Sequence, residues 1–418
     1  MSHMTARNAY KSLEERLNNF PQGAPPSETL YKILKILFSE KEAELVSQLP
    51  IKPFTAKKAA EIWGIPETEA IVVLEELASR AVLLDILYKG VRKYVLPPPM
   101  AGFFEFSIMR TNGKLDQQAL SELFYQYLNV EEEFVRKLLI EGETKMGRVL
   151  ANEYALSLGR DSDPIQILDW EKATYHIEQA KHIGVSMCYC RHKMQHIGKA
   201  CKAPMEICMT FGNVADSLIR HGHARRIDAD ECKKLLQEAY DNNLVQCAEN
   251  VRDEIAFICN CCGCCCEFLM AAKKYGALHS IATSNFIPKV KDENCINCKK
   301  CVRICPINAI SFSENSVKID EEICIGCGVC GRNCPVEAII LEEREKKIIP
   351  PLSTAHRVVL MAIERGKLAQ LIFDNKALYS HRVMGTILGS ILKLPLSQRI
   401  LANNQVKSKY LGALLKDM

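Results

Sequence analysis

Eight of the twenty cysteines fall into two sets that share one internal spacing. Each set reads C-x2-C-x2-C-x3-C and is followed by a proline, Pro306 in the first set and Pro335 in the second. Two-residue gaps let one tight loop turn three sulfurs inward, while the fourth cysteine is carried away and can ligate a second centre. Two zinc sites would need only C-x2-C pairs and would leave the fourth cysteine of each set unexplained. The spacing therefore predicts iron–sulfur chemistry at Cys295, Cys298, Cys301 and Cys305, and at Cys324, Cys327, Cys330 and Cys334.

The two sets belong to an internal repeat of residues 295–320 and 324–349, offset by 29 positions. This motif resembles the bacterial-type two-cluster ferredoxins over roughly 65 residues. The resemblance implies a ferredoxin-like domain at 287–349, with short strands at 310–312 and 317–319, that binds two [4Fe–4S] clusters. It also implies that the fourth cysteines are exchanged. The first cluster would take Cys295, Cys298, Cys301 and Cys334, and the second would take Cys324, Cys327, Cys330 and Cys305.

A second cysteine system precedes the repeat. It consists of a C-Y-C-R-H segment with two cysteines after it, and of six cysteines within eight residues. So many oxidisable thiols are hazardous as mere core packing, which favours a metal-binding interpretation. We expect one or two further iron–sulfur clusters, or one larger one, held by Cys188, Cys190, Cys201, Cys208, Cys259, Cys261, Cys262, Cys264, Cys265 and Cys266. Two other cysteines differ. Cys232 is in register with the apolar face of a helix and is expected in the core. For Cys247, both core packing and metal binding stay open.

The geometry of the six-cysteine string depends on the local structure. If a helix begins at Cys262, then Cys262, Cys265 and Cys266 share one face of it, and Cys261 and Cys264 face elsewhere.

Two side chains beside the C-x-C pair are candidate catalytic residues. Arg191 could offset the negative charge of a cluster or hold a substrate carboxylate, and His192 could donate a proton. Chains that combine a CYCRH-type segment, a CNCCGCCC-type string and a terminal two-cluster ferredoxin are similar to a group of multi-cluster iron–sulfur proteins of anaerobes. That resemblance implies an electron carrier or an oxidoreductase subunit.

These sites must be positioned by several domains, because 418 residues exceed one ordinary domain. No cysteine precedes Cys188 or follows Cys334. We predict an α+β multidomain protein with six segments: an N-terminal extension (1–27), a winged-helix-like domain (28–112), a helical connector (113–165), a helical cysteine-rich domain (166–286), the ferredoxin-like domain (287–349) and a basic helical tail (350–418).

The winged-helix prediction depends on pattern alone. Apolar periodicity predicts helices over 28–38, 55–63 and 66–80, and alternation predicts a hairpin over 81–96. The third helix carries four glutamates against one arginine, and phosphates repel such a surface. We therefore expect a protein-docking module rather than a DNA reader, although the basic hairpin leaves the DNA alternative open.

The connecting segments give further expectations. Helices are predicted over 117–148, 169–182, 230–240, 354–371 and 380–394, and a strand over 183–187. After Pro350 the chain has ten basic and three acidic residues. A basic amphipathic helix there could lie on a membrane surface, but packing on the protein or on a partner is favoured.

Composition limits the remaining function classes. The polar start (1–15) has no apolar signal segment and no apolar run reaches 18 residues, so we expect a reducing cytoplasm, with peripheral membrane contact as an alternative. Neither nucleotide-binding glycine motif is present. The preferred hypothesis is an electron-transfer protein that serves a redox partner protein. The alternatives are a reductase with an open cluster site and a redox-sensing winged-helix regulator, and self-association into a homo-oligomer stays open.

Overall fold

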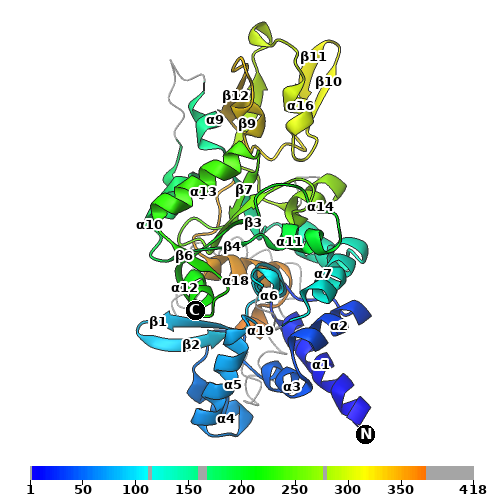
Figure 1. Ribbon diagram of the computed structural model, residues 1–418, viewed down its shortest axis with the longest axis vertical. Coiled ribbons are helices and arrows are strands. Elements are labelled where there is room, and N and C mark those ends of the chain that lie inside the picture. Colours follow the sequence, from blue (N-terminus) through cyan, green and yellow to red (C-terminus); the bar gives the residue numbers. More distant parts are fainter. Residues whose placement is uncertain (1, 112–114, 159–166, 276–279, 373–418) are drawn as a thin grey trace.

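The computed structural model describes residues 2–111, 115–158, 167–275 and 280–372. Three layers follow one another along the long axis of the molecule (Figure 1). A helical N-terminal module occupies one end, a six-stranded sheet with flanking helices lies in the middle, and a region that contains the cysteine repeat, residues 286–349 (the repeat region), forms the other end. The mixed helix-and-sheet prediction is thus confirmed at the level of fold class.

The N-terminal module follows the sequence pattern closely, with two added helices. Ser27 and Thr55 cap two of the predicted helices through their side chains, and Lys89 and Gly90 form the hairpin turn with positive φ. A capping box of Ser39 and Glu42 starts a helix that periodicity did not indicate. The elements are α1 (Ser2–Asn19), α2 (Glu28–Leu37), α3 (Glu40–Ser47), α4 (Ala56–Trp63), α5 (Glu67–Ser79), β1 (Leu84–Tyr88) and β2 (Val91–Val95).

A buried carboxylate fastens the β1–β2 hairpin to the sheet layer. Asp85 of β1 is fully buried and accepts hydrogen bonds from Ser217 (2.6 Å), Arg92 (2.7 Å) and Arg220, with His221 3.0 Å away. Burial alone would raise the pKa of Asp85, but the hydrogen bonds from His221, Arg220 and Ser217 outweigh it and hold this pKa well below its usual range. Since Ser217, Arg220 and His221 belong to α12 (Gly212–Arg220) and its C-terminal cap, the hairpin is fixed to the rest of the chain.

The connector is helical only in its first part. Just before the connector, Phe103 and Phe104 are buried, and their rings meet edge-on with 5.0 Å between the ring centroids. The predicted helical stretch to residue 148 is wrong at its end, where Gly147–Leu150 pairs with another strand as β3. The non-helical turn Pro99–Phe103 and α6 (Phe104–Ile108) precede the connector, whose helical elements are α7 (Gln117–Tyr125), the π-type turn Gln126–Val130, α8 (Glu133–Val135) and the π-type turn Arg136–Ile140.

The cysteine-rich domain is built on a sheet, which corrects the prediction of a helical domain. Six strands pair antiparallel in the order β3-β7-β8-β5-β4-β6. The strands are β3 (Gly147–Leu150), β4 (Ile183–Met187), β5 (Glu206–Phe211), β6 (Arg225–Ile227), β7 (Val245–Glu249) and β8 (Phe257–Cys261). The strand predicted at 183–187 is confirmed without a shift.

Helices cover this sheet and connect its strands (Figure 1). Asp169 begins a short 3-10 turn (Asp169–Glu171) rather than a long helix, and the helix predicted to reach 182 ends at Gln179. The helix predicted at 230–240 is confirmed as α13, with Asp228 as its cap. The helices of this layer are α10 (Ala173–Gln179), α11 (Tyr189–His196), α12 (Gly212–Arg220), α13 (Ala229–Asp241) and α14 (Glu267–Tyr275), whereas α9 (Glu153–Ser157) packs against the repeat region.

In the repeat region, the two halves use their strands differently. The first half forms the expected hairpin, with Ile310 opposite Ile319. The strand of the second half instead pairs with the strand that precedes the first half, so that Ile339 lies opposite Val290. The elements are β9 (Phe286–Val290), the 3-10 turn Asp292–Asn294, α16 (Lys300–Ile304), β10 (Ile310–Ser313), β11 (Ser316–Ile319), α17 (Val329–Arg332) and β12 (Ile339–Glu343).

The last described segment returns to the N-terminal module. The helix predicted at 354–371 is broken at Gly366, whose φ is 64°, into α18 (Thr354–Glu364) and α19 (Leu368–Ile372). Arg365 donates to the carbonyl groups of Pro21 (2.9 Å) and Lys137 (2.9 Å), and Lys367 donates to that of Phe20 (3.1 Å). The predicted helix at 380–394 lies outside the described residues. Among the helices that are described, none is both long enough and apolar enough to cross a bilayer.

Candidate iron–sulfur sites

The two cysteine loops of the repeat region have matching backbones. Each loop needs left-handed residues at the same repeat positions: Asn297 and Lys299 in the first loop correspond to Gly326 and Gly328 in the second. After each loop, an alanine N–H donates to the sulfur of the fourth cysteine, from Ala309 to Cys305 (3.2 Å) and from Ala338 to Cys334 (3.3 Å). Backbone donors aimed at sulfur stabilise thiolates, as a cluster site requires.

The exchanged ligand sets implied by the ferredoxin resemblance are brought together in space. A small pocket is lined by the first set, Cys295, Cys298, Cys301 and Cys334. In the second set, Cys327, Cys324 and Cys305 are the neighbours whose charge raises the pKa of Cys330, after burial, the main cause. Each set thus supplies four convergent sulfurs, and the residues present fit two [4Fe–4S] clusters.

The two sets differ in exposure. In the outer set Cys298 is exposed, and its neighbour Ile296 is 61% exposed. In the inner set Cys324, Cys327 and Cys330 are all buried, because this half of the repeat region faces the six-stranded sheet. The repeat region therefore has one side open to solvent and one side directed into the protein.

Upstream, seven of the remaining cysteines form a connected cage of thiols. Neighbouring thiols close a ring in which each one perturbs the pKa of the next, and Cys247 adjoins Cys261. The ring runs in the order Cys188, Cys190, Cys266, Cys261, Cys259, Cys208 and back to Cys188. We call these seven residues the cysteine cage. Within the described part of the chain, no three of its sulfurs lie within 4.8 Å of one another, so the ring is open rather than collapsed.

The sheet register explains the cage. Cys259 and Cys261 lie two apart on β8 and so face the same side of the sheet. Cys247 of β7 lies directly opposite Cys259, and Cys208 of β5 lies opposite Ser186, two residues before Cys188. Cross-strand neighbours on one face stand about 5 Å apart at Cβ. Antiparallel pairing thus gathers thiols from four separate segments of the chain.

Burial contributes to a raised pKa in six of the seven cage thiols, whereas hydrogen bonds with Cys190 and Cys208 lower the pKa of Cys188. A hydrogen bond with Cys261 lowers the pKa of Cys247, but burial and neighbouring thiols raise it to about 11. Burial and a hydrogen bond with Cys261 likewise raise the pKa of Cys266, against a hydrogen bond with Cys190 that lowers it. A bound metal reverses this balance, since coordination deprotonates a thiol outright. The chemistry of this donor set therefore fits a cationic metal centre.

The other four upstream cysteines form a separate, compact group, Cys201, Cys262, Cys264 and Cys265, which we call the cysteine quartet. Its members come from the loop after α11 and from the turn between β8 and α14. The expected helix from Cys262 is wrong, because α14 begins only at Glu267. Cys264 therefore joins Cys262 and Cys265 instead of facing elsewhere, and Cys266 belongs to the cage.

Of the two candidate catalytic residues, only Arg191 reaches the thiols. Its side chain is fully buried and donates to the carbonyl groups of Pro204 and Asn260. Burial lowers the pKa of Arg191, but Cys188, Cys208 and Cys262 outweigh it and raise this pKa above its usual value. Arg191 thus lies between the cage and the quartet. His192 instead points to the carbonyl group of Ile108 (2.6 Å) and to His196 (3.1 Å).

A cavity of about 370 Å³ reaches the cysteine cage. All six ring cysteines line it, and its other walls are largely apolar, with Met109, Phe257 and Val358 among them. Glu105 also lines the cavity, and burial raises the pKa of this carboxyl group to about 7 even though two backbone N–H groups donate to it. The cage is accessible to a molecule of modest size from this side.

Several residues at these sites carried no sequence signal. Cys247 lies on an ordinary strand, and only its register opposite Cys259 places it in the cage. Lys193 and Glu267 form a fully buried ion pair beside Cys266, with Asn129 bonded to both. Cys232 lies in the apolar core, 3.6 Å from the sulfur of Met209, as expected.

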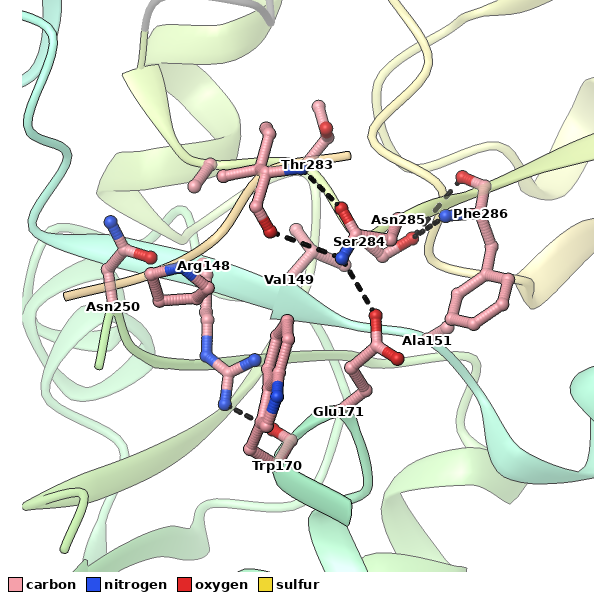
Figure 2. Close-up of a pocket in the computed structure, with 13 residues that line it drawn as sticks. Arg148, Val149, Ala151, Trp170, Glu171, Asn250, Thr283, Ser284, Asn285 and Phe286 are labelled. Carbon is pink, nitrogen blue, oxygen red and sulfur yellow. Dashed lines mark hydrogen bonds between the residues drawn. The ribbon is translucent and has the colours of Figure 1, made fainter. Parts of the chain in front are cut away.

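A separate small pocket, of about 10 Å³, is a structural junction (Figure 2). Arg148 reaches the carbonyl group of Trp170, and Asn285 donates to Glu171 at 2.9 Å. This network joins β3 to the segment that enters the repeat region, and it leaves room for about one water molecule.

The repeat region matches the family model described as "4Fe-4S dicluster domain" over residues 288–341. The chain therefore carries a domain that binds 4Fe–4S clusters, and the ferredoxin-type prediction is confirmed for this segment. No curated protein and no solved structure matches the chain.

Proposed function

We propose that this protein transfers electrons between an external redox partner and an internal iron–sulfur centre in the cysteine cage. Bound iron–sulfur clusters supply one-electron redox chemistry. The observation that carries the proposal is the contact between the inner side of the repeat region and the cage. Val149 of β3 lies opposite Cys247 of the cage, and three residues later the N–H of Asn152 donates to the carbonyl group of Cys327 of the inner set at 2.9 Å.

Close packing supports the same route. Gly263, in the turn that joins the cage to the quartet, lies against the backbone of Pro306, directly after Cys305 of the inner set. A Cβ atom on Gly263 would stand 2.0 Å from the Pro306 carbonyl oxygen. Arg332 also donates to Asp241 at 2.5 Å, and Asn333 to Asn243 at 2.7 Å, which fixes α17 on the end of α13. The two cysteine systems are therefore held together rigidly.

The test counts cofactors in anaerobically purified protein. We expect iron and acid-labile sulfide well above eight of each per chain, and an EPR signal beyond those of the dicluster domain. Cys208→Ser should remove the additional signal and leave the dicluster signals. Cys232→Ser is the matched control, because Cys232 is a buried cysteine outside the cage. About eight iron and eight sulfide per chain, the content of two cubanes, would refute the internal centre.

The outer side of the repeat region is the proposed entry point for the partner. The exposed apolar side chain of Ile296 is followed in the sequence by three exposed basic residues, Lys299, Lys300 and Arg303, and preceded by the exposed Asp292 and Glu293. Such a surface attracts a partner with an acidic face. In Lys299→Glu/Lys300→Glu, reduction by anionic dithionite should slow and reduction by a cationic viologen radical should accelerate. Equal changes with both reductants would contradict steering at this surface.

The cavity of about 370 Å³ favours a second candidate function, a reductase that acts on a small molecule at the cage. An incompletely ligated iron in the cage would bind carbon monoxide, and the EPR spectrum would change. Met109→Trp should fill the cavity and suppress that change. An unaltered spectrum of the wild-type protein under carbon monoxide would count against this function.

We propose that the winged-helix-like N-terminal module packs and docks proteins, and that it does not read DNA. Its hairpin is fixed on α12 through Asp85, and Arg92 of the basic hairpin is already paired with that carboxylate. Arg80, the basic residue next to α5, is bonded to Glu42 and to the carbonyl group of Leu37. A regulator would bind duplex DNA in one oxidation state. Binding at physiological salt in either state would overturn this assignment.

A further inference from the structure

The cysteine quartet differs from every other cysteine group in how close its sulfurs are. The Sγ–Sγ distances are 3.6 Å for Cys201–Cys262, 3.7 Å for Cys264–Cys265 and 3.9 Å for Cys201–Cys265. All four sulfurs lie within 4.8 Å of one another. The quartet is therefore a compact tetrahedron of thiols.

This spacing matches a single metal ion. A metal–sulfur bond of about 2.3 Å places the corners of a regular tetrahedron about 3.8 Å apart. A cubane holds its four cysteines at the corners of a larger four-iron body. The dicluster domain serves as an internal reference, since its eight cysteines are described and no three of them gather within 4.8 Å. By the same measure the quartet is too tight for a cubane.

The surroundings of the quartet suit a closed anionic site. A divalent ion with four thiolates carries two negative charges in excess. The buried Arg191 places its positive charge close to Cys262, and Lys273 donates to the carbonyl group of Gly263 at 2.7 Å. The hydrogen bonds of the quartet thiols run among themselves, and the charge of Arg191 lies close to Cys262 of the quartet and to Cys188 and Cys208 of the cage. The quartet is thus a separate site from the cage.

The geometry points to a mononuclear tetrathiolate site: we propose that Cys201, Cys262, Cys264 and Cys265 bind one zinc-class metal ion, Zn²⁺ or Fe²⁺, that holds no sulfide. Four protein ligands and no open position are typical of structural sites. The ion joins the loop after α11 to the turn that presses Gly263 against Pro306. Its role is to fasten the dicluster domain to the sheet layer.

The test compares metal and sulfide counts in full-length protein. We expect either one zinc per chain or one iron in excess of sulfide. Cys264→Ser alters the exposed member of the quartet, so it disturbs the core least; it should lose that one ion and retain all sulfide. Cys208→Ser, in the cage, should lose iron and sulfide together and keep the single ion. Cys232→Ser should lose neither.

Two results for Cys264→Ser would overturn the proposal. The variant could lose iron and sulfide in equal numbers, or it could have the same metal content as the wild type. Should this variant fail to fold, wild-type protein produced with Co²⁺ in the medium gives an independent reading. Tetrahedral cobalt–thiolate absorption bands from one cobalt per chain support the site, and their absence refutes it.

Discussion

Replacing Gly263 by alanine tests the contact between the two cysteine systems most directly. A Cβ atom there would lie 2.0 Å from the carbonyl oxygen of Pro306, whereas real Cβ atoms keep at least 3.0 Å, so the two segments must separate by about 1.0 Å. The obstacle is backbone on the opposite side, which cannot rotate away as a side chain can. Gly263 is not among the glycines with positive φ, so backbone strain adds nothing. Overpacking of this kind costs about 1–3 kcal/mol.

The assay is thermal unfolding of anaerobically purified protein, followed through the visible absorbance of its clusters. At about 2–4 °C per kcal/mol for a unit of this size, the expected decrease in Tm is about 2–12 °C. Gly147→Ala is the matched control, because its Cβ would meet the ring of Phe268 at 3.2 Å, a side chain that can shift. If Gly263→Ala has the same Tm as the wild type and Gly147→Ala has a lower Tm, the inferred close contact is wrong.

Three further predictions concern buried charge. Asp85→Asn should lower the free energy of unfolding by about 2–3 kcal/mol, as for lost hydrogen bonds to a charged group; an unchanged urea midpoint would contradict this. Burial lowers the pKa of His176 to about 4 despite its hydrogen bond to a backbone carbonyl. Below about pH 6.5 the unfolded chain binds a proton at this histidine that the folded protein does not bind. The free energy of unfolding therefore decreases as the pH is lowered. His176 should contribute about 1.3 kcal/mol to the loss between about pH 7.5 and about pH 5.5, and His176→Gln should reduce the pH dependence of urea unfolding by about that amount. Lys193→Met should cost about 3–5 kcal/mol by stranding the buried carboxylate of Glu267, and Lys193→Met/Glu267→Leu should recover much of it; equal midpoints for the single and double variants would refute the pairing.

Local signals in the sequence were sufficient for local structure. The strand at 183–187, the hairpin turn at Lys89-Gly90 and the helix α13 all follow from periodicity, capping and turn chemistry within a few residues. The eight-cysteine motif is also local, because its loops turn the sulfurs inward by spacing alone. These features needed no knowledge of distant parts of the chain.

The arrangement of the upstream cysteines could not be read in this way. Membership of the cage is decided by strand register, which pairs Cys247 with Cys259 across β7 and β8. Periodicity suggested a helix from Cys262, but the chain forms a turn there, and α14 starts after the last cysteine. That turn sends Cys264 and Cys265 to the quartet and Cys266 to the cage. Division of one string between two sites is thus a property of tertiary structure.

The connection made by Arg365 has a consequence for how the protein is made. This side chain binds carbonyl groups at Pro21, Gln22, Lys137, Leu138 and Glu141, which are among the first parts of the chain to be synthesised. A ribosome delivers Arg365 only after both cysteine systems have emerged. Until then these carbonyl groups cannot form their hydrogen bonds to Arg365. The contact that joins the last described helices to these early segments therefore forms only after all the metal-binding segments have been synthesised.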